Sequence, residues 1–267
     1  MHADGTKTYA AVTQFEVNSA RTAFPCWDEP LLKANFTTSI ISPKEFVCIS
    51  NMDVASETDV ISKQTNAVKK LVRFNTTPRM STYLAAWAIG EMNYIESDNF
   101  RIPIRVYAPP SQDIQTGKYA LQAAVDALTF YESAYGINFP LPKMDIVAIN
   151  DFSAGAMENW GIVTFRAELL SYTKERVSAS SKVGASNVVA HELAHMWFGD
   201  LVTMKWWSDI WLNEGLYVPT YPYSPTQVML ANSLCSAEHM STVSFPFRST
   251  LNLGVLWQLM YGICSTL

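Results

Sequence analysis

One pentapeptide dominates this sequence, His191-Glu192-Leu193-Ala194-His195. Residues four apart on a helix lie one turn apart on the same face, so His191 and His195 can direct both imidazoles at a single ion. Glu192 lies one residue around the helix, within reach of a water on that ion without being a ligand. A helix is favoured because apolar residues form a stripe and Gly199 is expected to end it; the stripe consists of Val188, Val189, Leu193 and Trp197.

An isolated motif of this kind is also typical of a helix whose two histidines are simply packed or solvated. The choice depends on a third ligand, because a catalytic zinc ion takes three protein ligands and keeps a fourth position open. Glu214 offers that ligand, with 18 residues between it and His195, enough for a loop and the start of a second helix. A single glutamate is more often a surface carboxylate. The combination predicts one Zn²⁺ per chain, with Glu192 as the catalytic residue and His191, His195 and Glu214 as metal ligands.

Two further features near the motif carry expectations. Asp200 and Asp209 are candidates for orienting a ligand histidine, although single acids are more often capping or surface residues. The tryptophans of this region are expected to lie in the core; they are Trp206, Trp207 and Trp211.

The order H-E-x-x-H, 18 residues, then N-E-G resembles the gluzincin zinc metallopeptidases, and specifically the M1 aminopeptidases. That family's exopeptidase signature, G-A-M-E-N, is present as Gly155-Ala156-Met157-Glu158-Asn159. The similarity runs from Tyr9 to Gly215. It implies a zinc aminopeptidase that removes the N-terminal residue of peptides, with a free N-terminus as the feature that its substrates share. It also implies substrate-binding residues, which are Gln14, Glu16, Gly155, Ala156, Met157, Glu158 and Asn159.

The residues around Glu158 are consistent with this role on physical grounds. They lie between two apolar, strand-like runs, 144–149 and 160–165, which predicts an edge strand beside the zinc helix. An edge strand can align a peptide through main-chain hydrogen bonds, while Glu158 presents a carboxylate to the substrate's α-ammonium. Gln14 and Glu16, two residues apart, would share one face of a strand. The plainer interpretation is a strand with one solvated glutamate.

The chain as a whole is predicted to have an α+β fold. Turn formers separate short β-branched and aromatic runs at 9–15, 35–41, 46–50, 71–75, 83–89 and 102–107. Helical spacing then appears over 116–135. With the resemblance, this predicts an antiparallel β domain remnant followed by a partial thermolysin-like catalytic domain. The expected divisions are the C-terminal part of an N-terminal β domain (1–109), the partial zinc peptidase domain (110–215) and a divergent tail (216–267).

The tail differs in composition from the rest of the chain. Of the 43 Asp, Glu, Lys and Arg residues, it contains only Glu238 and Arg248. M1 enzymes are much longer, so the resemblance implies truncation at both ends. The family's oxyanion-stabilising tyrosine lies downstream, and the tail's own tyrosines do not match its context; they are Tyr217, Tyr221, Tyr223 and Tyr261. A catalytically inactive product, either unstable or bound to a full-length relative, is therefore the alternative to an active peptidase.

Composition narrows the other partners. With 49% hydrophobic residues, 16% charged residues and a net charge of −5, the chain is neither disordered nor a coiled coil. A pI near 5.4 argues against nucleic acid as a partner. The uncharged stretch 249–267 is long enough for a membrane span, but its polar residues and glycines disfavour one. Four scattered cysteines without C-x-x-C spacing favour a reducing compartment, hence the cytoplasm, with secreted and membrane-anchored forms left open. No feature indicates an oligomeric state.

Overall fold

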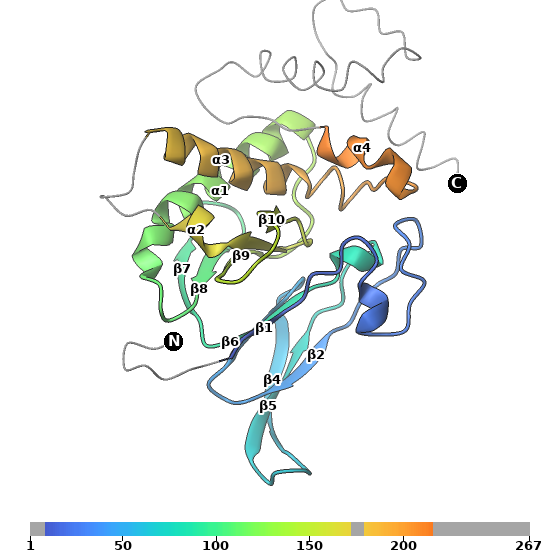
Figure 1. Ribbon diagram of the computed structural model, residues 1–267, viewed down its shortest axis with the longest axis vertical. Helices are drawn as coiled ribbons and strands as arrows, with labels where there is room; N and C mark the ends of the chain where they lie inside the picture. Colours follow the sequence, from blue (N-terminus) through green and yellow to red (C-terminus); the bar gives the residue numbers. More distant parts are fainter. Residues whose placement is uncertain (1–8, 172–178, 216–267) are drawn as a thin grey trace, which may run out of the picture.

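The structure is a computed structural model that describes residues 9–171 and 179–215. The expectations for the tail, for the stretch 249–267 and for the four downstream tyrosines lie outside the described residues. Within them, strands and helices are both present, and antiparallel sheets precede the helical part (Figure 1), so the predicted α+β class is confirmed.

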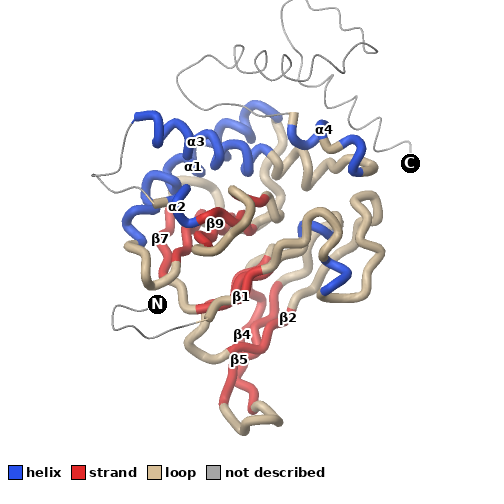
Figure 2. Tube along the Cα trace, in the orientation of Figure 1, coloured by secondary structure: helices blue, strands red, loops and turns tan. Residues whose placement is uncertain are grey.

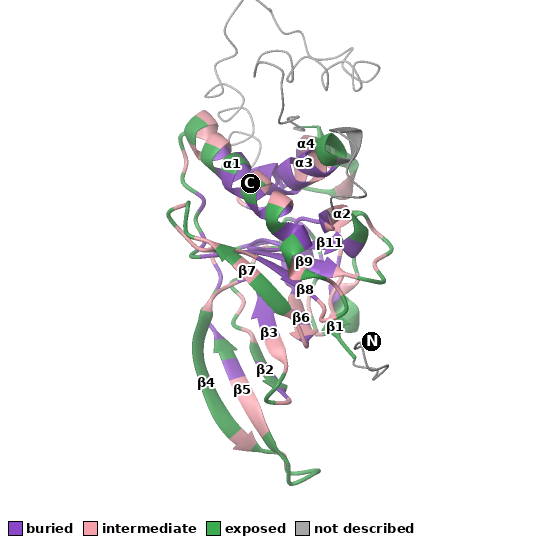
Figure 3. Cartoon of the chain, turned by 90° about the vertical axis from the view of Figure 1, so that its left-hand side faces the viewer, coloured by how far each residue is buried: buried purple, intermediate pink, exposed green. Residues whose placement is uncertain are grey.

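The first part of the chain forms two three-stranded antiparallel sheets. One has the order β1-β6-β3, with bounds Ala11–Val12, Trp87–Gly90 and Val47–Ser50. The other has the order β2-β5-β4, with bounds Ser39–Ser42, Val68–Phe74 and Val54–Ile61. The β4–β5 hairpin extends away from the rest of the molecule, and β4 is exposed along almost its whole length (Figure 3).

A five-stranded sheet follows, with the order β10-β11-β9-β8-β7. Its strands are Ala156–Met157, Ile162–Arg166, Met144–Ile149, Ile104–Ala108 and Asn93–Ser97. The three central strands are parallel, whereas β7 and β10 pair antiparallel at the two edges. Helix α1 (Lys118–Tyr135) connects β8 to β9, because parallel neighbours require a crossover. The chain leaves the first two sheets and enters the five-stranded sheet between Gly90 and Asn93. The sequence pattern changes later, at residue 110, because the sequences of β7 and β8 look like two more antiparallel strands.

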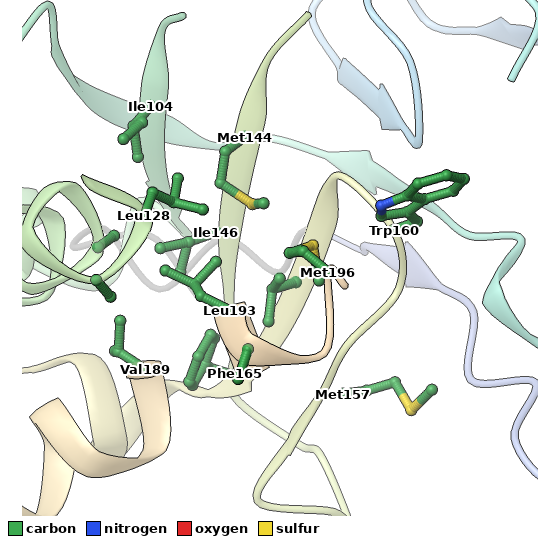
Figure 4. Close-up of a cluster of buried hydrophobic side chains, with 14 of the residues drawn as sticks. Ile104, Leu128, Met144, Ile146, Met157, Trp160, Phe165, Val189, Leu193 and Met196 are labelled. Carbon is green, nitrogen blue, oxygen red and sulfur yellow. The ribbon is translucent and has the colours of Figure 1, made fainter. Parts of the chain in front are cut away.

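This sheet is covered on both faces. Helices α1 and α3 (Ala179–Ala194) pack together on one face, and the first two sheets lie on the opposite side (Figure 2). Helix α1 buries the residues that its sequence spacing marked, which are Leu121, Val125, Leu128 and Tyr131. Figure 4 shows the core between helices and sheet, with Leu128 from α1, Val189 and Leu193 from α3, and Ile104, Met144, Ile146 and Phe165 from the sheet.

Two short helices complete the described part, α2 (Ala167–Leu170) and α4 (Trp211–Glu214). Among the described helices, none combines the length and apolar character needed to cross a membrane.

Asn51 joins the first part of the chain to the five-stranded sheet. It follows β3, and its side chain is 2% exposed. Its Nδ2 donates to the carbonyls of Leu84 (2.8 Å) and Trp160 (2.9 Å), and its Oδ1 accepts from the backbone N–H of Ala86 (2.9 Å). One amide side chain therefore fixes the turn that follows residues 155–159 against the β part.

Lys143 and Gly161 make a second connection at the same place. The buried Lys143 ammonium donates to the carbonyls of Ser50 and Gly161 and pairs with Asp145 at 2.8 Å. Gly161 has a φ of +80°, and a Cβ there would lie 2.4 Å from the carbonyl oxygen of Asn51. Glycine is required because the two backbones approach too closely for any side chain.

Candidate metal centre

The structure brings together the three residues that the sequence predicts as metal ligands. His191 lies in the last turn of α3, and the N–H of His195 still donates to the carbonyl of His191 (3.3 Å), so both rings keep their helical register. The two Nε2 atoms are 3.1 Å apart. The Oε2 atom of Glu214, on α4, lies 3.2 Å from the Nε2 of His191 and 3.7 Å from that of His195. One ligand atom from each residue therefore lies within 4.8 Å of the others.

The ring of His195 is held by a backbone carbonyl. Its Nδ1 lies 2.9 Å from the carbonyl oxygen of Phe198, and the side chain is almost fully buried. Donation from Nδ1 to this carbonyl leaves Nε2 with a free lone pair, the form that binds a metal. Asp200 does not take this role: it is fully buried, and neither carboxylate oxygen has a hydrogen-bond partner in the described part of the chain. Asp209 lies half-buried in a short 3-10 helix, 207–209.

Carboxylates outnumber positive charges around these ligands. Burial raises the pKa of Glu192 well above its ordinary value, and the charge of Glu158 raises it further. Burial, together with Glu158 and Glu214, raises the pKa of Glu16 to about 7. Burial alone lowers the pKa of His195, but nearby carboxylates outweigh it and the pKa lies well above normal. Hydrogen bonds from both histidines hold the pKa of Glu214 well below its usual range.

These properties fit a divalent cation. When both imidazoles are neutral, their lone pairs and the carboxylate oxygen that point at one place repel each other unless a proton or a metal cation lies between them. Two nitrogens and one oxygen are also the donor set of a catalytic zinc site with one open position. The donor set and the surplus of negative charge therefore both match Zn²⁺.

The segment 155–159 lies at the edge of the five-stranded sheet, as expected. Its strand β10 pairs with β11 on one side, Ala156 opposite Phe165 and Met157 opposite Thr164, and it contacts α3. Gly155 is exposed and Ala156 half-buried, whereas the next three residues are buried. In residues 9–171 and 179–215, no strand pairs with the other side of β10, so this edge can accept another strand.

Glu158 is the charged residue of this segment. It is 5% exposed, and its Oε1 has no hydrogen-bond partner among the described residues. Its charge contributes to the pKa shifts of Glu192, His195 and Glu16, so it lies close to the predicted ligands. The neighbouring Asn159 is fully buried.

Neither Gln14 nor Glu16 lies on a strand, and Glu16 lies near the same centre, since the charges of Glu158, Glu214 and His195 act on it. Strand β1 ends at Val12, although the N–H of Thr13 still donates to the carbonyl of Trp87 (3.1 Å). The expectation of one shared strand face is therefore wrong for these two residues. Gln14 is half-buried, and its Oε1 is buried without a partner among the described residues.

Sequence reasoning misplaced two tryptophans and missed two polar residues. Trp206 is 48% exposed and Trp211 is 57% exposed, so neither lies in the core. Their large apolar side chains suggested burial, but burial depends on tertiary neighbours. Tyr83 and Asn213, both 2% exposed, are hydrogen bonded to each other beside the ligands. Asn213 directly precedes Glu214, a position that could have pointed to it, whereas nothing in the sequence around Tyr83 indicates this contact.

The chain matches known proteins along most of its length. Residues 119–234 match the peptidase family M1 domain, and residues 1–84 match the peptidase M1 N-terminal domain. The chain is 49% identical over 211 residues to Aminopeptidase 2, mitochondrial, of Saccharomyces cerevisiae, covering 79% of this chain and 21% of that protein. The chain is also 49% identical over 211 residues to Alanine/arginine aminopeptidase of the same yeast; the match covers 79% of this chain and 24% of that protein. Puromycin-sensitive aminopeptidase of Caenorhabditis elegans is 46% identical over 213 residues, with 79% and 22% covered. The chain thus spans between about a fifth and a quarter of the length of these relatives.

Proposed function

The chain belongs to the M1 peptidase family, and we propose that it carries a zinc aminopeptidase site that hydrolyses the N-terminal residue from peptides. One Zn²⁺ would be held by His191, His195 and Glu214. The observation that supports this most strongly is the convergence of their three ligand atoms within 4.8 Å, next to the buried Glu192.

Glu192 is the proposed general base. When bound, zinc supplies Lewis-acid activation of water and of the scissile carbonyl. Glu192 takes the proton of the attacking water and returns one to the leaving nitrogen, a role worth about 10²–10⁴ in rate. Burial raises the pKa of the Glu192 carboxyl, which makes its carboxylate a stronger proton acceptor than that of an exposed glutamate.

Glu158 is the proposed anchor for the substrate's α-ammonium, with Gln14 and Glu16 as further contacts. Its buried oxygen without a partner needs a donor, and an ammonium supplies both hydrogen and positive charge. Gly155 and Ala156 would pair with the substrate backbone along the free edge of β10. Met157 and Asn159 support this strand from the buried side, where the Asn159 amide donates to the hydroxyl of Thr164 (3.4 Å). Cleavage is thereby limited to one residue from a free N-terminus.

Hydrolysis of aminoacyl fluorogenic amides by the purified chain tests the proposal. We expect release of the fluorophore, its loss in Glu192→Gln, and no change in the matched control Glu168→Gln, whose carboxylate is exposed on α2. The N-acetylated amide should not be cleaved, because it lacks the ammonium. Bound zinc without Glu192-dependent turnover would instead identify a catalytically inactive member of the family.

We propose the cytoplasm as the compartment. Four scattered cysteines suit a reducing environment, and the two in the described part of the chain, Cys26 and Cys48, are free thiols. Fractionation of cells that express the protein would test this, with recovery in a secreted or membrane fraction as the contrary result.

A further inference from the structure

Tyr83 reaches the metal centre from the β part of the chain. It lies in a short 3-10 helix, Thr82–Leu84, between the sheets that precede the catalytic part. The side chain is 2% exposed, and its ring packs edge-on against Trp207, with centroids 5.1 Å apart. The ring is therefore held on both sides of the boundary between the two parts.

Its hydroxyl contacts the loop that orients His195. The Tyr83 hydroxyl donates to the carbonyl of Gly199 at 3.5 Å. Gly199 directly follows Phe198, whose carbonyl accepts from the Nδ1 of His195. A shift of the Gly199 peptide would therefore displace the carbonyl that fixes the His195 ring.

The same hydroxyl contacts the helix that carries Glu214. It accepts a hydrogen bond from the Nδ2 of Asn213 at 3.3 Å, and Asn213 directly precedes Glu214 on α4. Both Tyr83 and Asn213 are buried, so water does not compete for this contact. A single hydroxyl thus links the supports of two of the three predicted ligands.

The surrounding packing leaves little freedom for this link. Gly199 has a φ of +136°, and a Cβ there would lie 3.3 Å from the Nδ1 of His195 and 3.5 Å from the Nδ2 of Asn213. The loop and the helix are therefore in close contact at Gly199, with the Tyr83 hydroxyl beside them. Loss of the hydroxyl would leave the Thr203 hydroxyl as the remaining side-chain donor to the Gly199 carbonyl, and it would remove the acceptor of the Asn213 amide.

We infer that Tyr83 is a positioning residue of the metal centre: its hydroxyl sets the separation of His195 and Glu214, and so raises the affinity for zinc. This inference rests on the proposed function, since it needs zinc at these ligands. Residues that orient metal ligands without touching the metal typically change affinity 10–100-fold when they are removed. We expect an effect of this size.

The test is the zinc dissociation constant of the full chain, measured by competition with a fluorescent chelator. Tyr83→Phe keeps the ring against Trp207 and removes only the hydroxyl. We expect its zinc dissociation constant to rise 10–100-fold, with one zinc per chain still bound at saturation. Tyr107→Phe is the matched control, because Tyr107 is a buried tyrosine on β8 that packs on Tyr94, and we expect no change in its zinc affinity.

Two further measurements separate positioning from stability. The visible absorption of bound Co²⁺ reports ligand geometry, so it should change in Tyr83→Phe and stay unchanged in Tyr107→Phe. Asn213→Ala should weaken zinc binding as Tyr83→Phe does, and the double variant should lose less than the sum, because the two residues share one contact. If Tyr83→Phe fails to fold, Asn213→Ala and its Co²⁺ spectrum test the same link.

The outcomes distinguish this inference from the proposed function. An unchanged zinc dissociation constant and Co²⁺ spectrum in Tyr83→Phe, with only a lower urea midpoint, would overturn the inference and leave the proposed function standing. A wild-type chain that binds no zinc would overturn both.

Discussion

Replacement of Asn51 by alanine should weaken the connection that fixes the turn after residues 155–159. The substitution removes three hydrogen bonds, to Leu84, Trp160 and Ala86, each between 2.8 and 2.9 Å. All three partners are main-chain groups of residues that are buried.

The size of the effect follows from these contacts. A buried polar group that loses its partner costs about 1–3 kcal/mol. Three such groups would cost up to about 9 kcal/mol, but the space left by the amide can admit water, which satisfies part of them. We therefore expect the free energy of unfolding to fall by about 3–5 kcal/mol, a large share of the ~5–15 kcal/mol typical of a folded domain.

Urea unfolding followed by tryptophan fluorescence measures this loss. Asn75→Ala is the matched control, because Asn75 is exposed and its amide makes one hydrogen bond, to the Oδ2 of the half-buried Asp53 at 3.0 Å; we expect a change within about 0.5 kcal/mol. A loss below about 1 kcal/mol for Asn51→Ala would contradict the reasoning. Asn51 would then not be what holds Trp160 and the preceding segment in place.

Three other substitutions have expected outcomes. Glu158→Gln should lower kcat/KM for free-amine substrates by about 10²–10³, because breaking a buried ion pair costs at least ~3 kcal/mol. The zinc content should stay the same, and a kcat/KM equal to that of wild type would exclude Glu158 as the anchor. Gly199→Ala forces a side chain into a φ of +136°, so urea unfolding should show a loss of about 1–3 kcal/mol, and an unchanged midpoint would refute the strain. Burial raises the pKa of Glu16 from 4.5 to about 7. Below pH 4.5 the carboxyl is neutral in the folded and the unfolded chain and costs no stability, whereas the free energy of unfolding falls as pH rises from there through about 7. Metal-free Glu16→Gln should therefore be more stable than metal-free wild type at pH 8, by about 1–3 kcal/mol, and equally stable below pH 4.5; equal urea midpoints at pH 8 would contradict this.

The elements with strong periodicity could be predicted from the sequence. Helix α1 was expected over 116–135 and forms over Lys118–Tyr135, because its apolar spacing matches one face that packs on the sheet. Strand β9 occupies the apolar run Met144–Ile149. The proximity of His191 and His195 could also be predicted, because helical spacing places both rings on one face wherever the helix lies.

Features that depend on tertiary neighbours could not be predicted. Strand β4 lacks an apolar face, because it lies in an exposed hairpin, and nothing in its sequence alternates. The parallel pairing of β8 with β9 depends on the crossover through α1, which composition does not reveal. Tyr83 was assigned to a strand over 83–89, whereas it lies in a 3-10 helix that aims its hydroxyl at Asn213, 130 residues away in the sequence.

Zinc binding by the wild-type chain and by Glu214→Gln provides the most direct test of the proposed site. After dialysis against metal-free buffer and titration with Zn²⁺, wild type should retain one zinc per chain, and Glu214→Gln should bind it far more weakly, because an amide oxygen carries no charge to balance the cation. A wild-type chain without zinc, or a Glu214→Gln variant with undiminished affinity, would show that His191, His195 and Glu214 do not form a metal site.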